Sequence, residues 1–115
     1  VTELITKLTQ IEKGNKEPTI SVGNLSAKRD FTDVRDVVEA YCLLLKNGIK
    51  GETYNVGSGE WIEIRDLLNI LLSLSNVEIK VQIDQNKYRP VDVPIVYSSN
   101  TKIKEHVNWN RNYTL

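Results

Sequence analysis

The sequence is poor in the residues that carry most metal-binding and nucleophilic chemistry. Among 115 residues there are one cysteine, one histidine and no methionine. Cys42 cannot form an internal disulfide, and no cluster of Cys and His has the spacing of a zinc site. His106 has no serine or cysteine nucleophile in a recognisable motif around it, so we expect a solvated surface histidine. The residue types therefore point to neither a metal centre nor a catalytic triad.

An excess of charge of one sign is also missing. The 15 Lys and Arg residues balance 15 Asp and Glu residues, which argues against general binding to nucleic acids or to membrane surfaces. No apolar run approaches the roughly 20 residues that span a bilayer, and no basic, apolar leader opens the chain. These features predict a soluble, cytoplasmic protein without a nucleic-acid or membrane partner.

The hydrophobic residues predict helices that alternate with short strands. The expected helices cover residues 2–13, 34–47 and 63–75, with a short last helix capped near Ser99 or Asn100. The expected strands cover residues 19–22, 31–34, 53–56, 79–83 and 95–97. Such alternation favours an α/β or α+β fold, and a length of 115 residues fits one domain or part of one.

The second helix has the clearest signals. Asp33 is placed to cap its first turn, with Asp36 as a weak capping-box partner, and Gly48 ends it. One apolar stripe runs along it, made of Val34, Val37, Val38, Tyr41, Leu44 and Leu45. Because Cys42 shares this helix, we expect a small buried thiol there.

Gly57-Ser58-Gly59 follows a predicted strand and invites a dinucleotide-binding interpretation. That fingerprint requires a third glycine three positions after the second, where the sequence has Ile62. A tight strand-to-helix turn fits better, so the chain is expected to lack a cofactor loop of its own.

Arg29 and Arg89 lie in polar segments, next to a predicted strand and to Pro90 respectively. A planar guanidinium suits phosphate because it stays charged and donates to two oxygens at once. Two loop arginines are also common as ordinary surface charges, so both interpretations remain open at the level of residue type.

Four segments resemble the nucleotide-sugar branch of the extended short-chain dehydrogenases. They are GNLSAKRDFTDVRDVV (23–38), YNVGSG (54–59), IRDLL (64–68) and YRPVDV (88–93). A weaker match is Asn108-Trp109, where relatives usually have Gly-Trp. The combination most resembles GDP-mannose 4,6-dehydratases and GDP-6-deoxy-4-keto-mannose reductases. It extends over essentially all of residues 1–115, which would form the C-terminal nucleotide-sugar-binding domain.

The resemblance implies roles for six residues. Arg29 and Arg89 match the arginines that clamp the diphosphate of a sugar nucleotide, and Asp92 matches an acidic acceptor for the ribose hydroxyls. Three residues border the base and phosphates with less defined roles: Asn24, Leu25 and Lys28. Asp33 and Asp36 are expected to cap their helix rather than to contact substrate.

The resemblance also implies what the rest of such an enzyme supplies. Relatives carry an N-terminal Rossmann unit that binds NAD or NADP, and a Tyr-x-x-x-Lys pair; this sequence has neither that pair nor a Gly-x-x-Gly-x-x-Gly turn. The fragment is thus expected to hold no cofactor and to be inactive, whereas the intact enzyme would be a homodimer acting on a nucleoside-diphosphate sugar. Elements near Tyr54 and after Asp33 would pack against the Rossmann unit. The alternative is a stand-alone, non-catalytic nucleotide-sugar-binding or structural module.

Overall fold

The computed structural model describes residues 1–115, which divide into two compact units of mixed α/β structure. Unit 1 comprises Val1–Ala27 and Glu63–Pro94, and unit 2 comprises Lys28–Ile62 and Ile95–Leu115. Each unit therefore combines two separate stretches of the chain. No helix has the length and apolar character needed to cross a membrane.

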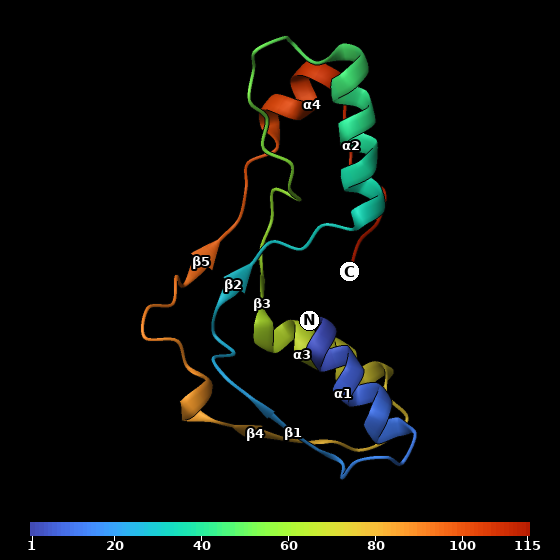
Figure 1. Ribbon diagram of the computed structural model, residues 1–115, viewed down its shortest axis with the longest axis vertical. Coiled ribbons are helices and arrows are strands. Elements are labelled where there is room, and N and C mark those ends of the chain that lie inside the picture. Colours follow the sequence, from blue (N-terminus) through green and yellow to red (C-terminus); the bar gives the residue numbers. More distant parts are fainter. The chain divides into compact units, whose positions relative to one another are not determined.

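Unit 1 packs two helices on a pair of parallel strands. Its elements are α1 (Thr2–Glu12), β1 (Thr19–Val22), α3 (Ile64–Leu74), β4 (Lys80–Ile83) and the short 3-10 helix η1 (Gln85–Lys87). β1 pairs with β4 from Thr19 opposite Lys80 to Val22 opposite Ile83. In Figure 1, α1 and α3 lie on one side of these strands. The core consists of Leu8, Ile11, Ile20, Val22, Leu25 and Leu68.

Unit 2 contains β2 (Lys28–Arg29), α2 (Val34–Asn47), β5 (Ile95–Val96) and α4 (Thr101–Val107). A third short strand, β3 (Ile62–Glu63), begins in this unit, and the sheet order is β3-β2-β5 with β2 and β5 parallel. The buried core of unit 2 consists of Ala40, Ile103, Val107 and Trp109, and Leu43, Leu44, Tyr54 and Val56 pack on it.

Trp109 is fully buried and joins α4 to α2 within this core. Asn108 ends α4 in the left-handed conformation, with φ of 55°, which asparagine tolerates better than most residues. The indole nitrogen of Trp109 donates to the carbonyl of Asp36 at 2.9 Å. Asn108 thus serves where relatives were expected to have glycine, and it directs the tryptophan into the core.

Asp36 is fully buried and does not act as a capping-box partner. Its carboxylate accepts backbone N–H groups from Asn112 and Tyr113 at 2.9 and 3.1 Å. The predicted Asp33 cap is confirmed, because its side chain accepts the Arg35 backbone N–H at 2.9 Å. Asp36 instead fixes the segment that follows Trp109 against α2.

Two strand predictions were wrong. The second strand lies at Lys28–Arg29 rather than at residues 31–34, because its partner β5 pairs with that earlier dipeptide. Residues 53–56 form no strand, although Tyr54 and Val56 pack on the core of unit 2. The expected helices are present as α1 to α4, and the strands at 19–22, 79–83 and 95–97 are confirmed with ends shifted by at most one residue.

The apolar stripe of α2 mostly faces away from the core of its own unit. Val34, Val38, Tyr41 and Leu45 have 71%, 53%, 58% and 88% of their surface exposed, whereas the small Ala40 is buried. Cys42 is exposed as well, so the expectation of a buried thiol was wrong. Periodicity identified the helix correctly but did not identify which of its faces meets the core. On α3, Leu74 is likewise exposed because it lies in the last turn.

Trp109 provides a test of the core of unit 2. We expect Trp109→Ala to lower the free energy of unfolding by about 3–5 kcal/mol, because it removes a large buried side chain. Trp61→Ala is the matched control: Trp61 is 45% exposed, and its loss should cost less than about 1 kcal/mol. Urea titration followed by circular dichroism measures both.

If Trp109→Ala does not fold, Trp109→Phe keeps an aromatic ring but removes the indole hydrogen bond and part of the buried ring volume, at a cost of about 1 kcal/mol or more. Equal losses for the two tryptophan-to-alanine variants would contradict this description of the core.

Candidate functional site

Asn24 and Asp92, two of the predicted binding residues, are brought together in unit 1 although 68 positions separate them. The Asn24 side-chain amide donates to the Asp92 carboxylate at 2.9 Å. The Asn24 carbonyl oxygen accepts the backbone N–H and the hydroxyl of Ser26, at 2.9 and 2.7 Å. Asn24 is thus fixed on one side by its own loop and orients Asp92 with the other.

Leu25 occupies a different environment from its neighbour. It is buried in the core of unit 1, and its carbonyl accepts the backbone N–H of Arg65 at 3.0 Å. Its contribution to a site is therefore to anchor the loop that carries Asn24.

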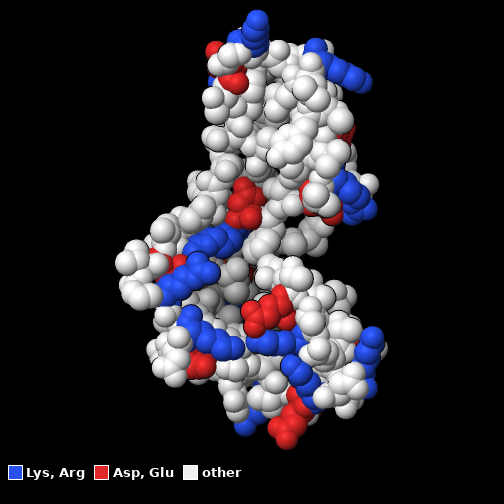
Figure 2. All heavy atoms as spheres, in the orientation of Figure 1, with Lys and Arg blue, Asp and Glu red and all other residues white.

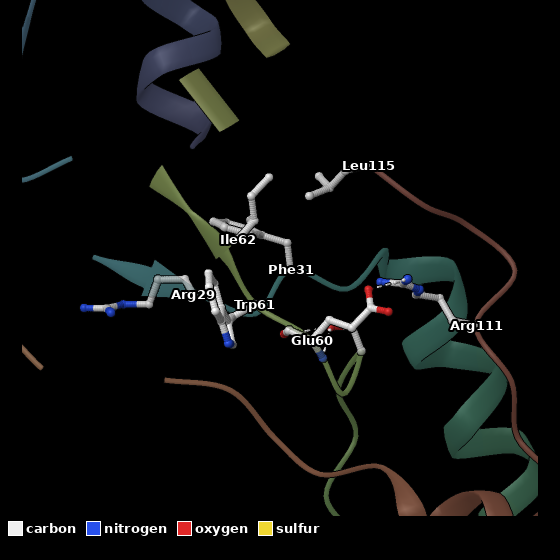
Figure 3. Close-up of a pocket in the computed structure, with 8 residues that line it drawn as sticks. Arg29, Phe31, Glu60, Trp61, Ile62, Arg111 and Leu115 are labelled. Carbon is white, nitrogen blue, oxygen red and sulfur yellow. Dashed lines mark hydrogen bonds and ion pairs between the residues drawn. The ribbon is translucent and has the colours of Figure 1, made fainter. Parts of the chain in front are cut away.

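Lys28 and Arg29 form β2 in unit 2, and both side chains are half-buried. The Lys28 ammonium lies 4.0 Å from the centre of the Trp61 ring, a cation–π contact. Arg29 donates from its guanidinium to the Lys28 carbonyl at 2.8 Å. In Figure 3, Arg29 lies beside Trp61, and its guanidinium points away from Phe31 and Leu115. The two cations therefore have different partners within unit 2.

The hollow drawn in Figure 3 is small, about 50 Å³, and opens between β2 and the C-terminal segment of unit 2. Arg111 closes one side of it by pairing with Glu60 at 3.0 Å. It has room for little more than solvent, so we assign it no ligand.

Arg89 belongs to unit 1, just after η1, and is exposed. Pro90 follows it and restricts its backbone to extended conformations. Arg29 and Arg89 thus lie in different units. Acidic and basic side chains are interspersed on the face drawn in Figure 2, in keeping with a formal net charge of zero.

Asp30 is a residue whose role the sequence did not reveal. Its carboxylate accepts the backbone N–H of Ser58 at 3.1 Å and that of Ser98 at 3.3 Å. A side chain at Gly57 would come within 2.6 Å of this carboxylate, so the turn requires glycine there. Asn100 completes the turn by donating to the carbonyls of Gly57 and Ser58, at 3.2 and 2.8 Å. The Gly57-Ser58-Gly59 turn is therefore built around Asp30 and Asn100, and it leads into β3.

Hydrogen bonds also lower the pKa values of two carboxylates that follow Arg29 in the sequence, Asp30 and Asp33. Partial burial raises the pKa of Asp30, but hydrogen bonds from Ser58, Ser98 and Thr32 outweigh it and leave the pKa below its ordinary value. At Asp33, the side chain and backbone of Arg35 lower the pKa to about 2. Both carboxylates are charged at neutral pH.

A cavity of about 460 Å³ in unit 1 lies beside Asn24 and was not predicted. Its charged lining residues are Glu3, Lys7 and Lys87, and the loop after β1 forms another wall. Glu3 and Lys7 are one helical turn apart, at a spacing that the sequence displays, but nothing local to α1 places Lys87 next to them.

The comparisons with known proteins match dehydratases, reductases and epimerases of nucleotide sugars. The family model described as GDP-mannose 4,6 dehydratase matches residues 1–115. GDP-6-deoxy-D-mannose reductase of Pseudomonas aeruginosa is 30% identical over 109 residues, which is 95% of this chain and 36% of the reductase. Probable UDP-arabinose 4-epimerase 1 of Oryza sativa subsp. japonica is 34% identical over 88 residues, which is 75% of this chain and 20% of the epimerase.

Among solved structures, that of RMD from Pseudomonas aeruginosa complexed with NADPH superposes with a TM-score of 0.89 at 29% identity. The match covers 97% of this chain and 37% of that one. The chain thus spans little more than a third of the length of the reductase and of the solved structure.

The hydrogen bonds of Asp30 predict a pH dependence of stability. Because folding lowers this pKa below the unfolded value near 3.8, the stabilisation is complete above about pH 4 and is lost as the pH falls through the folded pKa. Asp30→Asn should cost about 1–2 kcal/mol at pH 7 and flatten the profile below pH 4. Urea titrations from pH 6 to pH 2.5 measure this.

Proposed function

The chain belongs to the GDP-mannose 4,6 dehydratase family, and we propose that it is the nucleotide-sugar-binding part of an NAD(P)-dependent enzyme acting on a GDP-linked sugar. The match of the family model to all 115 residues is the observation that carries this proposal. The reaction is either a 4,6-dehydration or the reduction of a 4-keto sugar, and it takes place in the cytoplasm. The comparisons support this range, since they include a GDP-6-deoxy-D-mannose reductase and the GDP-mannose 4,6 dehydratase family model.

The proposed roles follow from the chemistry of the side chains. Arg29 and Arg89 bind the diphosphate, because two guanidinium groups match its charge and its pairs of oxygens. Asp92 accepts hydrogen bonds from the ribose hydroxyls, and Asn24 orients its carboxylate through the 2.9 Å hydrogen bond. Lys28, held on the face of Trp61, adds positive charge on the same strand as Arg29.

These residues bind and orient, but they do not transfer protons. NAD(P), when bound to the intact enzyme, supplies hydride exchange at C4 of the sugar. The sequence contains no Tyr-x-x-x-Lys pair, so the proton-transfer groups belong to a part of the enzyme outside these 115 residues. The contribution of this chain is to hold the nucleotide so that the sugar reaches them.

A dinucleotide-binding Rossmann unit is the proposed partner of unit 2. The exposed residues Val34, Val38, Tyr41 and Leu45 follow one another at spacings of four, three and four positions, which places them on one face of α2. Residues 53–56 lack a strand partner. We propose that both features pack against that unit in an enzyme that is a homodimer. Relatives that include UDP-arabinose 4-epimerases support a second candidate, a 4-epimerase of a UDP-sugar.

Binding measurements test the proposal. Titration calorimetry of the 115-residue chain with GDP-mannose should give an affinity no better than about millimolar, because exposed charged contacts are worth about 1 kcal/mol or less each. Arg29→Ala and Arg89→Ala should each abolish the detectable binding, and His106→Ala should leave it unchanged. The chain should show no turnover with added NAD(P).

Tighter binding of UDP-glucose than of GDP-mannose would favour the epimerase instead. Turnover by these 115 residues alone, or binding that survives loss of both arginines, would contradict the proposal.

The exposed face of α2 should cause the isolated chain to self-associate. We expect sedimentation velocity to show dimers or larger species above about 50 μM, because a continuous apolar stripe tends to be covered by another molecule. The double variant Val38→Lys/Leu45→Lys should shift the chain to monomer. Val91→Lys is the control, since Val91 is 85% exposed and belongs to unit 1, whereas α2 belongs to unit 2. A monomeric parent chain at these concentrations would contradict the prediction.

A further inference from the structure

The Lys28 ammonium is held by an aromatic ring rather than by a carboxylate, since it lies 4.0 Å from the centre of the Trp61 ring. Neighbouring carboxylates have other partners: Asp30 accepts backbone N–H groups, and Glu60 pairs with Arg111 at 3.0 Å. In Figure 3, the Glu60 carboxylate points toward Arg111 and away from Trp61. A ring attracts a cation without cancelling its charge. The positive charge of Lys28 therefore remains available to an anion.

The backbone on both sides of Trp61 is fixed. Before it, the Ser58 hydroxyl donates to the Glu60 carbonyl and accepts the Glu60 N–H, each at 3.1 Å. After it, β3 begins at Ile62 and lies next to β2, the strand of Lys28, in the sheet. The indole itself is 45% exposed and belongs to neither core. Its position beside β2 is therefore set by the fold, while its ring is not used to fill a core.

This contact changes what an anion meets at β2. A lysine side chain loses rotamer freedom when its ammonium is fixed by a ligand. The ring restricts Lys28 before the ligand arrives, so binding loses less of that freedom. An ammonium has three donors, and contact with the ring on one side leaves donors for phosphate oxygens on the other.

We infer that Trp61 is a positioning residue that holds the Lys28 ammonium for the diphosphate of the nucleotide sugar, an inference that rests on the proposed function. Trp61 acts through Lys28 and needs no contact with the ligand. Unit 2 provides a contrast at Tyr113, whose ring centre lies 3.5 Å from the Arg35 guanidinium. Arg35 also pairs with Asp33 at 2.9 Å, so the charge of that cation is neutralised.

Nuclear magnetic resonance titration of the ¹⁵N-labelled chain with GDP tests this inference. Trp61→Leu keeps an apolar side chain but removes the ring, and it should weaken GDP binding about threefold. Trp61→Tyr and Trp61→Phe keep a ring for the ammonium and should stay within about twofold of the parent affinity. A merely structural role would not separate Trp61→Leu from Trp61→Phe, because both place an apolar side chain at this half-exposed position.

A double-mutant cycle shows whether Trp61 acts through Lys28. Lys28→Gln should weaken GDP binding about fivefold, the value of one exposed charged contact. On that background, Trp61→Leu should cause no further loss. Tyr113→Leu is the matched control, because it removes a ring from a cation that is already paired, and it should leave the affinity unchanged. Urea titration of each variant verifies that it is folded under the conditions of the binding measurement.

The outcomes separate the inference from the proposed function. If Arg29→Ala and Arg89→Ala abolish GDP binding while Trp61→Leu binds as the parent chain does, the proposed function stands and the inference fails. Equal affinities of Trp61→Leu and Trp61→Phe, or a further loss from Trp61→Leu in the Lys28→Gln background, also overturn the inference. If GDP at about 10 mM shifts no resonance of the parent chain, the inference and the proposed function fail together.

Discussion

The Asp30 carboxylate determines how the segment that carries Arg29 is built. It accepts backbone N–H groups from Ser58 and Ser98, which belong to two stretches of unit 2 that are 40 positions apart. A carboxylate suits this place because it accepts several hydrogen bonds at once and is partly shielded from water. Gly57 is required because any side chain there would displace the carboxylate. This arrangement reinforces the pairing of β5 with Lys28 and Arg29.

The parts of the fold that the sequence predicted well are those set by local interactions. α1 and α2 were recognised from apolar spacing, capping by Asp33 and the stop at Gly48, all within one or two turns of chain. The position of β2 could not be recognised in this way, because its pairing with β5 depends on residues more than 60 positions away. The face that α2 turns to the core was also misjudged, because core contact there falls on the small residue Ala40 rather than on the larger apolar ones.

In the candidate site, too, the features that the sequence did not predict depend on contacts between distant segments. Resemblance alone brought Asn24 and Asp92 into consideration, and the structure joins them by a hydrogen bond that no local pattern predicts. Asp30 lies within residues 23–38, one of the segments that carry the family resemblance. Its neighbours in the sequence do not indicate that its carboxylate holds other segments by hydrogen bonds. The sequence did not single out Lys87, because its position depends on contacts with Ser21 and Gly23, which are distant from it in the chain. Contacts between distant segments account for each of these omissions.

The groups proposed for the diphosphate and ribose cannot distinguish one nucleotide sugar from another. GDP-linked and UDP-linked sugars share both of these parts, so Arg29, Arg89 and Asp92 would serve either equally well. Discrimination has to come from side chains that face the base, and these must differ in hydrogen-bonding character to separate one base edge from another. In unit 1, the cavity beside Asn24 brings ammonium and carboxylate groups together over apolar surface. The arginines proposed for the diphosphate lie on β2 and in the loop after η1, whereas the charged residues of this cavity lie on α1 and at the end of η1.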